Sequence, residues 1–172
     1  MFKSIFFICI FLGIVGFQNT EEPVVGAIAP DFSMVSLTGE NINLSTLKGS
    51  IVFVDFWASW CLPCRKQNLL LEKIHDKYRK LARRYDMKIY FISISLDTNK
   101  ELWKVAVLKD NLDPKKQLCD FGGWESAITK SYHIKKLPSS FLIDTKGKII
   151  AKDIWGETLT DTLDKLFNQL SN

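Results

Sequence analysis

Several features are scarce in this chain, and each scarcity excludes a class of protein. Four cysteines in 172 residues are too few for a small domain held together by disulfides, so any cysteine chemistry is local. The 23 Lys and Arg residues against 19 Asp and Glu give a net charge of +4. No segment gathers five or six like charges, so nucleic acid is not an indicated partner. Repeats, low-complexity tracts and interdomain linkers are also lacking, which leaves a single globular domain as the expectation.

Long hydrophobic runs are lacking too, apart from one near the N-terminus. Residues 5–15 are apolar and follow a lone basic residue, Lys3; this run suits a signal-peptide core and is short for a bilayer span. No clean Ala-x-Ala cleavage pattern follows, so residues 1–20 are interpreted as a signal peptide or an uncleaved N-terminal membrane anchor. Cys9 lacks the small preceding residues that a lipidated cysteine needs. We therefore expect an exported, periplasmic protein whose folded domain spans residues 21–172.

Hydrophobic periodicity predicts the elements in the first half of this domain. A turn cluster at residues 38–41 indicates a β-hairpin, and a single helical turn closed by Gly49 follows it. Residues 51–57 form a continuous β-branched and aromatic run, which is typical of a strand buried on both faces. Apolar residues at three- and four-residue steps predict a long helix over residues 62–85. A second strand at residues 88–96 completes a crossover unit, whose two strands we expect to be parallel.

The second half contains more turn signals. Residues 98–130 are predicted as helix, loop and helix, because Asp113-Pro114 and Gly122-Gly123 interrupt any regular element. Two short apolar runs flank Thr145-Lys146-Gly147, which is the pattern of an antiparallel hairpin with glycine at the left-handed position. A last amphipathic helix has Leu159 on its apolar face.

The motif that carries chemistry is Cys61-Leu62-Pro63-Cys64. It lies at the end of a predicted buried strand and at the start of the long helix, the arrangement expected of a dithiol redox site. At that position the first sulfur meets unpaired backbone N–H groups and the positive end of the helix dipole, which stabilise a thiolate. Arg65 and Lys66 add positive charge nearby. We predict that Cys61 is the exposed nucleophile and that Cys64 resolves the mixed disulfide.

A zinc site or an inert structural disulfide would suit the cysteine pair less well. A zinc site needs a second half, and Cys119, His75 and His133 offer no paired spacing. An inert structural disulfide would close so small a loop that it would constrain little of the entropy of the unfolded chain. Cys119 is interpreted as a buried, inert thiol, with a regulatory or intermolecular role as the alternative. His75, on a charged helix, is expected to be solvated.

Aromatic and acidic residues near the motif are further candidates. Asp55 lies within the apolar run, so it is either buried, with a raised pKa, or solvated at the end of the sheet. Trp60 could form a flat apolar platform for substrates, or could simply pack at a strand end. The remaining tryptophans that follow the motif are predicted to be core or capping residues: Trp103, Trp124 and Trp155.

A family resemblance becomes specific at these residues. The segment VDFWASWCLPC, residues 54–64, resembles the active-site segment of the thioredoxin family. Residues 29–32, 47–49 and 132–144 resemble the exported TlpA/ResA-type branch, which is related to the AhpC/TSA group. The resemblance covers most of the domain. It implies an α/β thioredoxin-like fold, with a central mixed β-sheet flanked by helices, an N-terminal β-hairpin extension and a helical insertion. It also implies a thiol-disulfide oxidoreductase that needs no bound cofactor or metal.

The same resemblance implies roles for single residues. Pro138 falls on the family's cis proline, which would expose the backbone of Leu137 to an extended substrate segment; by base rates alone it would be an ordinary trans proline before a strand. Asp55 matches the buried aspartate of thioredoxins, which implies a proton acceptor for Cys64. The chain departs from the branch at Gln67, where the relatives commonly have an acid. Asp55 is therefore the better candidate for acid–base chemistry.

Three functions from different classes follow. The first is an exported oxidoreductase that exchanges its disulfide with cysteine pairs of exported proteins, mainly as a reductant, with cytochrome c maturation as one pathway. Its partners would be protein thiols and disulfides and an upstream, membrane-bound electron donor, and it would act as a monomer. The second is a thiol peroxidase of the peroxiredoxin type, which Ala58 disfavours because that family has Thr there. The third is a non-catalytic binding module on a thioredoxin scaffold.

Overall fold

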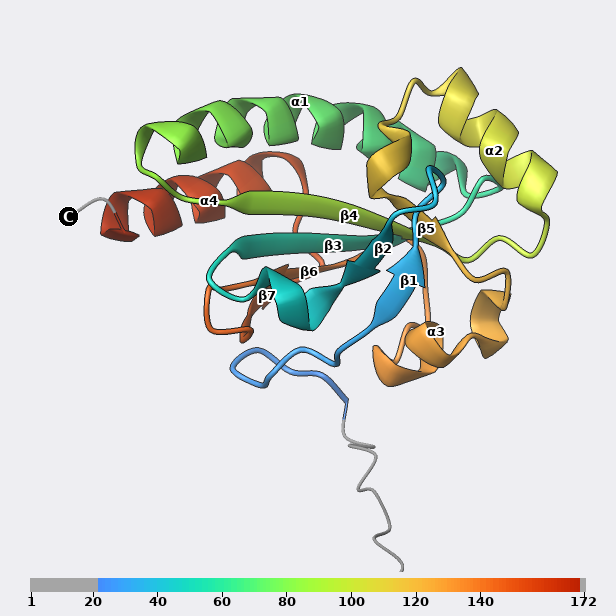
Figure 1. The fold of residues 1–172 in the computed structure, drawn as a ribbon, viewed down its shortest axis with the longest axis horizontal. Coiled ribbons are helices and arrows are strands. Elements are labelled where there is room, and N and C mark those ends of the chain that lie inside the picture. Colours follow the sequence, from blue (N-terminus) through green and yellow to red (C-terminus); the bar gives the residue numbers. More distant parts are fainter. Residues whose placement is uncertain (1–21, 171–172) are drawn as a thin grey trace, which may run out of the picture.

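The computed structural model describes residues 22–170, in which a five-stranded sheet is covered on both faces (Figure 1). The apolar run at residues 5–15, and with it the predicted signal peptide or anchor at residues 1–20, lies outside the described residues. Within residues 22–170 no helix combines the length and the apolar character that crossing a membrane requires.

Strands and helices alternate along the described part of the chain. The strands are β1 (Ser33–Val35), β2 (Asn41–Asn43), β3 (Ile51–Trp57), β4 (Ile89–Ser95), β5 (Gln117–Cys119), β6 (Ser139–Ile143) and β7 (Ile149–Lys152). The helices are α1 (Leu62–Arg84), α2 (Lys100–Lys109), α3 (Ala127–Ser131) and α4 (Gly156–Leu170). Short 3₁₀ turns are η1 (Leu44–Leu47), η2 (Pro114–Lys116) and η3 (Gly123–Glu125).

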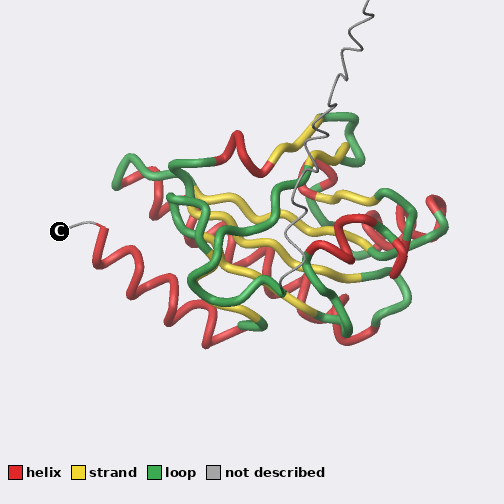
Figure 2. The backbone as a smooth tube through the Cα atoms, turned by 90° about the horizontal axis from the view of Figure 1, so that it is seen from below, coloured by secondary structure: helices red, strands yellow, loops and turns green. Residues whose placement is uncertain are grey.

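The main sheet has the strand order β5-β4-β3-β6-β7, with β3 in the middle. β3 pairs parallel with β4 and antiparallel with β6, so the sheet is mixed. All seven residues of β3 are buried, because the strand is paired on both edges and covered on both faces. The predicted parallel crossover and both predicted hairpins are confirmed, the second hairpin turning at Gly147 with a φ of 82°. Figure 2 shows the strands side by side from the face that carries β1 and β2.

Two hydrophobic clusters form on opposite faces of this sheet, because successive strand residues point to opposite sides. On one face Phe53 of β3 packs in a cluster with Leu163 of α4 and residues of α1. On the other face Val54 belongs to a cluster that includes Met34 of the hairpin and Tyr132 after α3. Figure 1 shows α1 and α4 together on one side of the sheet, and the hairpin and α3 on the other. The loop from β3 to α1 leaves the sheet at the carboxyl end of its central strand.

Local sequence determines where α1 begins. Cys61 is the N-cap residue, and its sulfur accepts a hydrogen bond from the Cys64 N–H. Pro63 lies in the first turn, where its missing N–H leaves no intrahelical bond unmade. The helix ends at Arg84, one residue before the predicted end.

The prediction for residues 98–130 was incomplete, because it lacked a strand. β5 pairs parallel with β4 over three residues, with Leu118 opposite Ile94. Three residues are too few to show an alternating pattern, and this strand forms because the edge of β4 offers backbone partners. The predicted second helix is also short, since α3 spans five residues after η3.

Candidate active site

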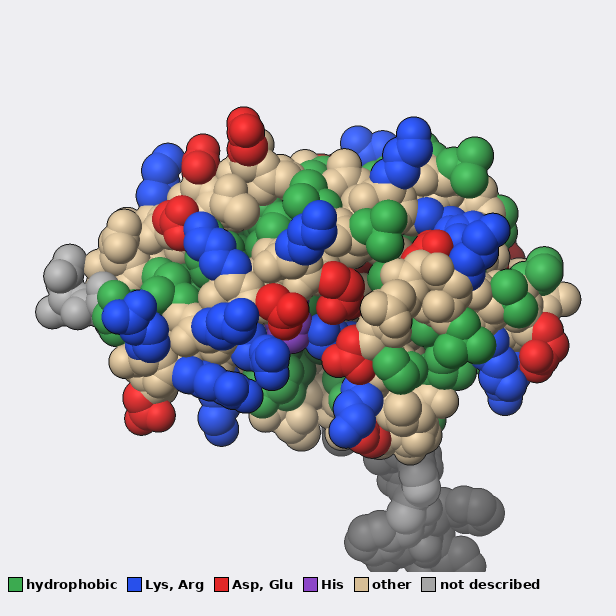
Figure 3. Space-filling model, turned by 90° about the horizontal axis from the view of Figure 1, so that it is seen from above, with side chains coloured by type: hydrophobic (Ala, Val, Ile, Leu, Met, Phe, Trp, Pro, Cys, Tyr) green, Lys and Arg blue, Asp and Glu red, His purple; other side chains and the backbone are tan. Residues whose placement is uncertain are grey.

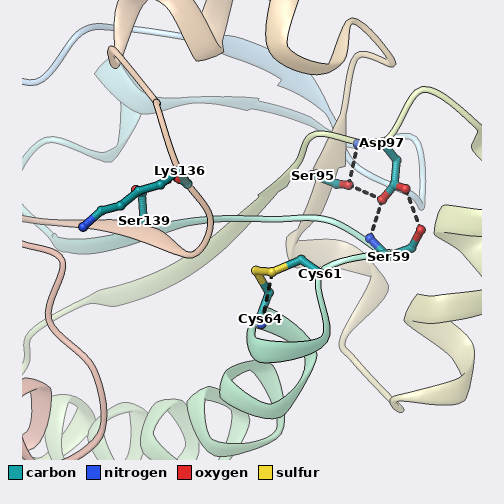
Figure 4. The surroundings of a disulfide bond; sticks show 7 residues. All are labelled: Ser59, Cys61, Cys64, Ser95, Asp97, Lys136 and Ser139. Carbon is teal, nitrogen blue, oxygen red and sulfur yellow. Dashed lines mark hydrogen bonds between the residues drawn. A yellow bond between two sulfur atoms is a disulfide. The ribbon is translucent and has the colours of Figure 1, made fainter.

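The two cysteines of the motif form a disulfide in the first turn of α1. Figure 4 shows this bond where the loop after β3 enters the helix. Cys61 is 6% exposed and Cys64 is 1% exposed. The expectation that Cys61 is exposed was wrong for this oxidised state, because the disulfide packs into one of the hydrophobic clusters. Cys61 is nevertheless the less buried of the two sulfur-bearing residues.

The start of α1 places a backbone N–H donor at the sulfurs. The Cys64 N–H donates to Cys61 Sγ over 3.3 Å, and such donors favour a thiolate after reduction. Arg65, expected to add positive charge here, instead donates to both carboxylate oxygens of Asp110 over 2.5 and 2.6 Å. This ion pair joins α1 to the end of α2 and pairs the Arg65 guanidinium with a carboxylate. Lys66 is exposed.

A buried carboxylate that was not among the candidates from the sequence holds the loop before Cys61. Asp97 accepts hydrogen bonds from the Ser59 N–H at 2.8 Å and from the Ser59 hydroxyl at 2.6 Å. The Ser95 hydroxyl donates to the same carboxylate over 2.5 Å, and Figure 4 shows this network beside the disulfide. Asp97 follows directly after the predicted second strand, so its position at the sheet's carboxyl end was the available signal. These hydrogen bonds tie the loop between β3 and α1 to the end of β4, and so hold Ser59, two residues before Cys61, in place.

The Leu137–Pro138 peptide bond is cis, as the family resemblance implies. Both residues are partly buried and immediately precede β6. The Ser139 hydroxyl donates to the Lys136 carbonyl over 3.0 Å, and Figure 4 draws these two flanking residues in the surroundings of the disulfide. The structure therefore brings the proline segment and the cysteine motif, 73 or more residues apart in the sequence, into one site.

Two tryptophans lie exposed next to the motif. Trp60 is 57% exposed and Trp124, in η3, is 44% exposed, with their ring centroids 6.5 Å apart. Leu62, also exposed, follows Cys61 directly. The expectation that Trp124 is a core or capping residue was wrong, whereas Trp103 is buried as expected. The two exposed rings therefore lie side by side next to the motif. Their proximity could not be predicted from the sequence, because the two residues are far apart along the chain.

Asp55 is buried, which decides between the two interpretations left open for it. It is 1% exposed, and one of its carboxylate oxygens accepts a hydrogen bond of 2.7 Å from the Ser93 hydroxyl on β4. Burial raises the pKa of Asp55 to about 7; the charge of Glu72 adds to the rise, and the Ser93 hydrogen bond opposes it. The carboxyl group can therefore exchange a proton near neutral pH.

His75 is buried rather than solvated, so that expectation was wrong. Its ring packs against Phe91 with centroids 5.1 Å apart. Its Nδ1 lies 2.8 Å from Lys116 Nζ and accepts from that ammonium group. Burial, and next the Lys116 charge, lower the pKa of His75 to about 4, so the imidazole is neutral near pH 7.

Cys119 has the character of an unreactive thiol. It is partly buried, and its sulfur donates to the Asp97 carbonyl over 3.4 Å. Burial raises the pKa of Cys119 to about 11, which removes the thiolate at neutral pH. Across residues 22–170 no three His, Cys, Asp or Glu side chains gather as a metal site would require.

The fold and the site together define a class. A mixed sheet of this strand order, a disulfide at the start of the helix after its central strand, and a cis proline just before the strand antiparallel to that central strand are those of thioredoxin-like thiol-disulfide oxidoreductases. Within that class the chain belongs to the AhpC/TSA family, whose family model matches residues 25–152.

Individual relatives are named as members of the same enzyme class. The thiol-disulfide oxidoreductase ResA of Bacillus cereus is 32% identical over 155 residues, which cover 90% of this chain and 83% of that protein. A thiol-disulfide oxidoreductase structure from Bacteroides fragilis superposes with a TM-score of 0.72 at 37% identity, covering 81% of this chain and 99% of that one. The thioredoxin domain of a Bacteroides vulgatus thiol-disulfide oxidoreductase superposes with a TM-score of 0.74 at 30% identity, covering 84% of this chain and 99% of that one. The predicted fold and enzyme class are confirmed.

Proposed function

We propose that this enzyme is an exported reductase, which passes two electrons from its Cys61–Cys64 dithiol to a disulfide of another exported protein. The observation that carries the proposal is the disulfide between these cysteines at the start of α1. A helix N-terminus stabilises the thiolate that opening this bond produces. The reaction class of the relatives supports the same chemistry.

The reaction runs through a mixed disulfide. The Cys61 thiolate attacks one sulfur of the substrate disulfide; a bond forms between these two sulfurs, the substrate bond breaks, and the other substrate sulfur leaves as a thiolate. Cys64 then gives its proton to Asp55 and attacks the Cys61 sulfur. The mixed disulfide breaks, and the second substrate sulfur leaves as a thiolate. The enzyme has lost two electrons and ends in the disulfide state of the structure.

Asp55 is the proposed proton acceptor in the second step. Its pKa of about 7 leaves about half of the carboxyl groups ionised at that pH, and a general base works best when its pKa lies near the operating pH. Asn68, one helical turn after Cys64, lines the same small cavity as Asp55. The carboxylate is therefore buried beneath the first turns of α1 rather than at the surface.

Substrate binding is assigned to the surface around Cys61. The partly buried Leu137, next to Pro138, would pair its backbone with an extended substrate segment, as a strand adds to an open sheet edge. Trp60 would provide the apolar platform, and Trp124 extends it. Aromatic rings bury large areas at a low cost in side-chain entropy, so they suit a site that accepts different protein segments.

Export and the electron supply are proposed from the sequence. The apolar run at residues 5–15 supports a signal peptide or a membrane anchor, with the folded domain spanning residues 21–172. Outside the cytoplasm thiols tend to oxidise, so a reductase there needs an upstream donor, which we propose to be membrane-bound. Cytochrome c maturation is the proposed pathway, and the enzyme is proposed to act as a monomer.

Trapping of the mixed disulfide tests the reaction. In a Cys64→Ser variant the second step is lost, so substrates should remain on Cys61 as adducts that dithiothreitol releases. The Cys119→Ser variant is the matched control and should turn over without accumulating adducts. Recovery of no adducts on Cys64→Ser would contradict the proposal.

A comparison of two assays separates the proposal from its alternatives. The reduced protein should reduce insulin disulfides much faster than it consumes peroxide. The reverse order would assign it to the peroxidases. A double variant with Ala at both cysteines should lose this reductase activity, and retention of the full cellular function by that variant would assign a non-catalytic binding role.

A further inference from the structure

A small cavity that includes Asp55 in its lining lies between β3, β4, α1 and the segment around η2 and the start of β5. Its volume is about 10 Å³, which is close to the smallest volume that holds one water molecule. Most of its polar lining comes from six residues: Asp55, Asn68, Glu72, His75, Lys116 and Gln117. Asp55, the proposed proton acceptor, therefore shares this cavity with polar side chains of α1 and of residues 116 and 117.

Three buried polar atoms on the lining lack a hydrogen-bond partner within residues 22–170: Asp55 Oδ2, Asn68 Nδ2 and Gln117 Oε1. Their residues are at most 3% exposed, so bulk solvent does not satisfy them. Buried polar groups without a partner are rare, because leaving them unpaired is costly. Three such atoms on one cavity wall point to a polar occupant.

The chemistry of these atoms selects the occupant. The carboxylate oxygen and the Gln117 carbonyl oxygen accept hydrogen bonds, and the Asn68 amide donates one. A water molecule offers two donors and an acceptor, which is the complement of this set. A metal ion would not bind the donating amide nitrogen of Asn68, and an organic molecule would not fit the volume.

Charged groups complete the outer side of the cavity. Lys116 Nζ lies 3.2 Å from a Glu72 carboxylate oxygen, 3.4 Å from one of Asp113 and 2.8 Å from His75 Nδ1. Arg79 and Asp76 on α1 also act electrostatically on His75. Figure 3 shows a histidine side chain among acidic and basic side chains on the molecular face above α1. Of these groups, Glu72 raises the pKa of Asp55.

We propose that this cavity is a binding site for one water molecule, that Asn68 and Gln117 position it, and that it donates a hydrogen bond to the Asp55 carboxylate. A hydrogen bond to the ionised form favours that form, so the water keeps Asp55 able to accept the Cys64 proton. Asn68 and Gln117 are positioning residues, since they act through the water. The inference rests on the proposed function only for the role of Asp55 in the second step.

An Asn68→Leu variant tests the site, because leucine removes the donor and fills the cavity. The expected result is a shift of the pH profile of the second step to higher pH. A shift of about one pH unit makes that step about tenfold slower at pH 6, whereas at pH 9 the rate returns to within about twofold of the wild type because Asp55 is then ionised in both proteins. A variant with an unmoved profile would overturn the inference.

Two more variants separate positioning from damage to the fold. Asn68→Ser keeps a polar group and leaves room for water, so it should restore most of the wild-type profile. Gln67→Leu removes the neighbouring side-chain amide, which does not line the cavity, and should not shift the profile. If Asn68→Leu fails to fold, Gln117→Met gives the same test, and its unshifted profile would equally refute the positioning role.

Diffraction data provide the direct test. The wild-type crystal structure should show one ordered water within hydrogen-bond distance of Asp55, Asn68 and Gln117, and the Asn68→Leu structure should not. A wild-type cavity without that water would overturn the inference even if reductase activity is present. Conversely, a bound water in a protein that reduces no disulfide at any pH would refute the proposed function and leave the water site intact.

Discussion

Replacing Asp55 by asparagine should stabilise this protein in a strongly pH-dependent way. Asp55→Asn keeps the shape of the side chain, and it removes the charge that burial makes unfavourable. Burial raises the pKa of Asp55 from 3.8 to about 7. The folded protein therefore holds a proton that the unfolded chain releases above pH 3.8, and the free energy of unfolding falls as the pH rises from about 4 to 7.

The expected magnitude follows from that shift. About three pKa units at 1.36 kcal/mol each correspond to about 4 kcal/mol lost above pH 7. The asparagine variant escapes this loss, so it should exceed the wild type by about 3–4 kcal/mol at pH 8 and by less than about 1 kcal/mol at pH 4. Such a gain is large beside a typical total of about 5–15 kcal/mol. We expect it to be accompanied by a slower second step, because the proton acceptor is gone.

Urea unfolding of the oxidised proteins at pH 4 and pH 8 measures the difference, with the disulfide intact so that the transition is two-state. Asp76→Asn, an exposed change on α1, is the control and should alter the free energy of unfolding by less than about 0.5 kcal/mol at either pH. An equal effect of Asp55→Asn at both pH values would refute the reasoning, since it would mean that the Asp55 pKa is the same in the folded and unfolded chains.

Two substitutions near the cysteines and one titration of a buried histidine give three further predictions. Asp97→Ala removes the acceptor of three hydrogen bonds and should lower the free energy of unfolding by about 2–4 kcal/mol, measured in urea; an unchanged value would mean that this network does not hold the loop. Trp124→Ala should raise KM for a protein disulfide several-fold and change the unfolding free energy by less than about 0.5 kcal/mol, because the ring is exposed; an unchanged KM would exclude it from substrate binding. The His75 pKa of about 4 lies below its unfolded value, so its contribution to stability is present above about pH 6.5 and is lost as the pH falls towards 4; an NMR titration of the ring with a midpoint near its unfolded value would contradict this.

The order of the helices and strands apart from β5, the cysteine motif and the class of chemistry could be predicted from the sequence, because each depends on neighbouring residues. The seven-residue run 51–57, apolar and aromatic except for Asp55, predicted a strand buried on both faces, and β3 is one. The spacing of the cysteines placed both in one helical turn. The turn at Gly147 needs a left-handed residue, which the glycine supplies.

Other features depended on contacts between distant segments, so only the tertiary structure decided them. β5 forms because the edge of β4 offers backbone hydrogen-bond partners, and Arg65 pairs with Asp110 because α2 ends beside α1. The exposure of Trp124 and the burial of His75 likewise depend on which elements cover them. A sequence specifies local propensity and periodicity, whereas burial, charge pairing and the pKa of Asp55 are set by side chains that are remote along the chain and adjacent in space.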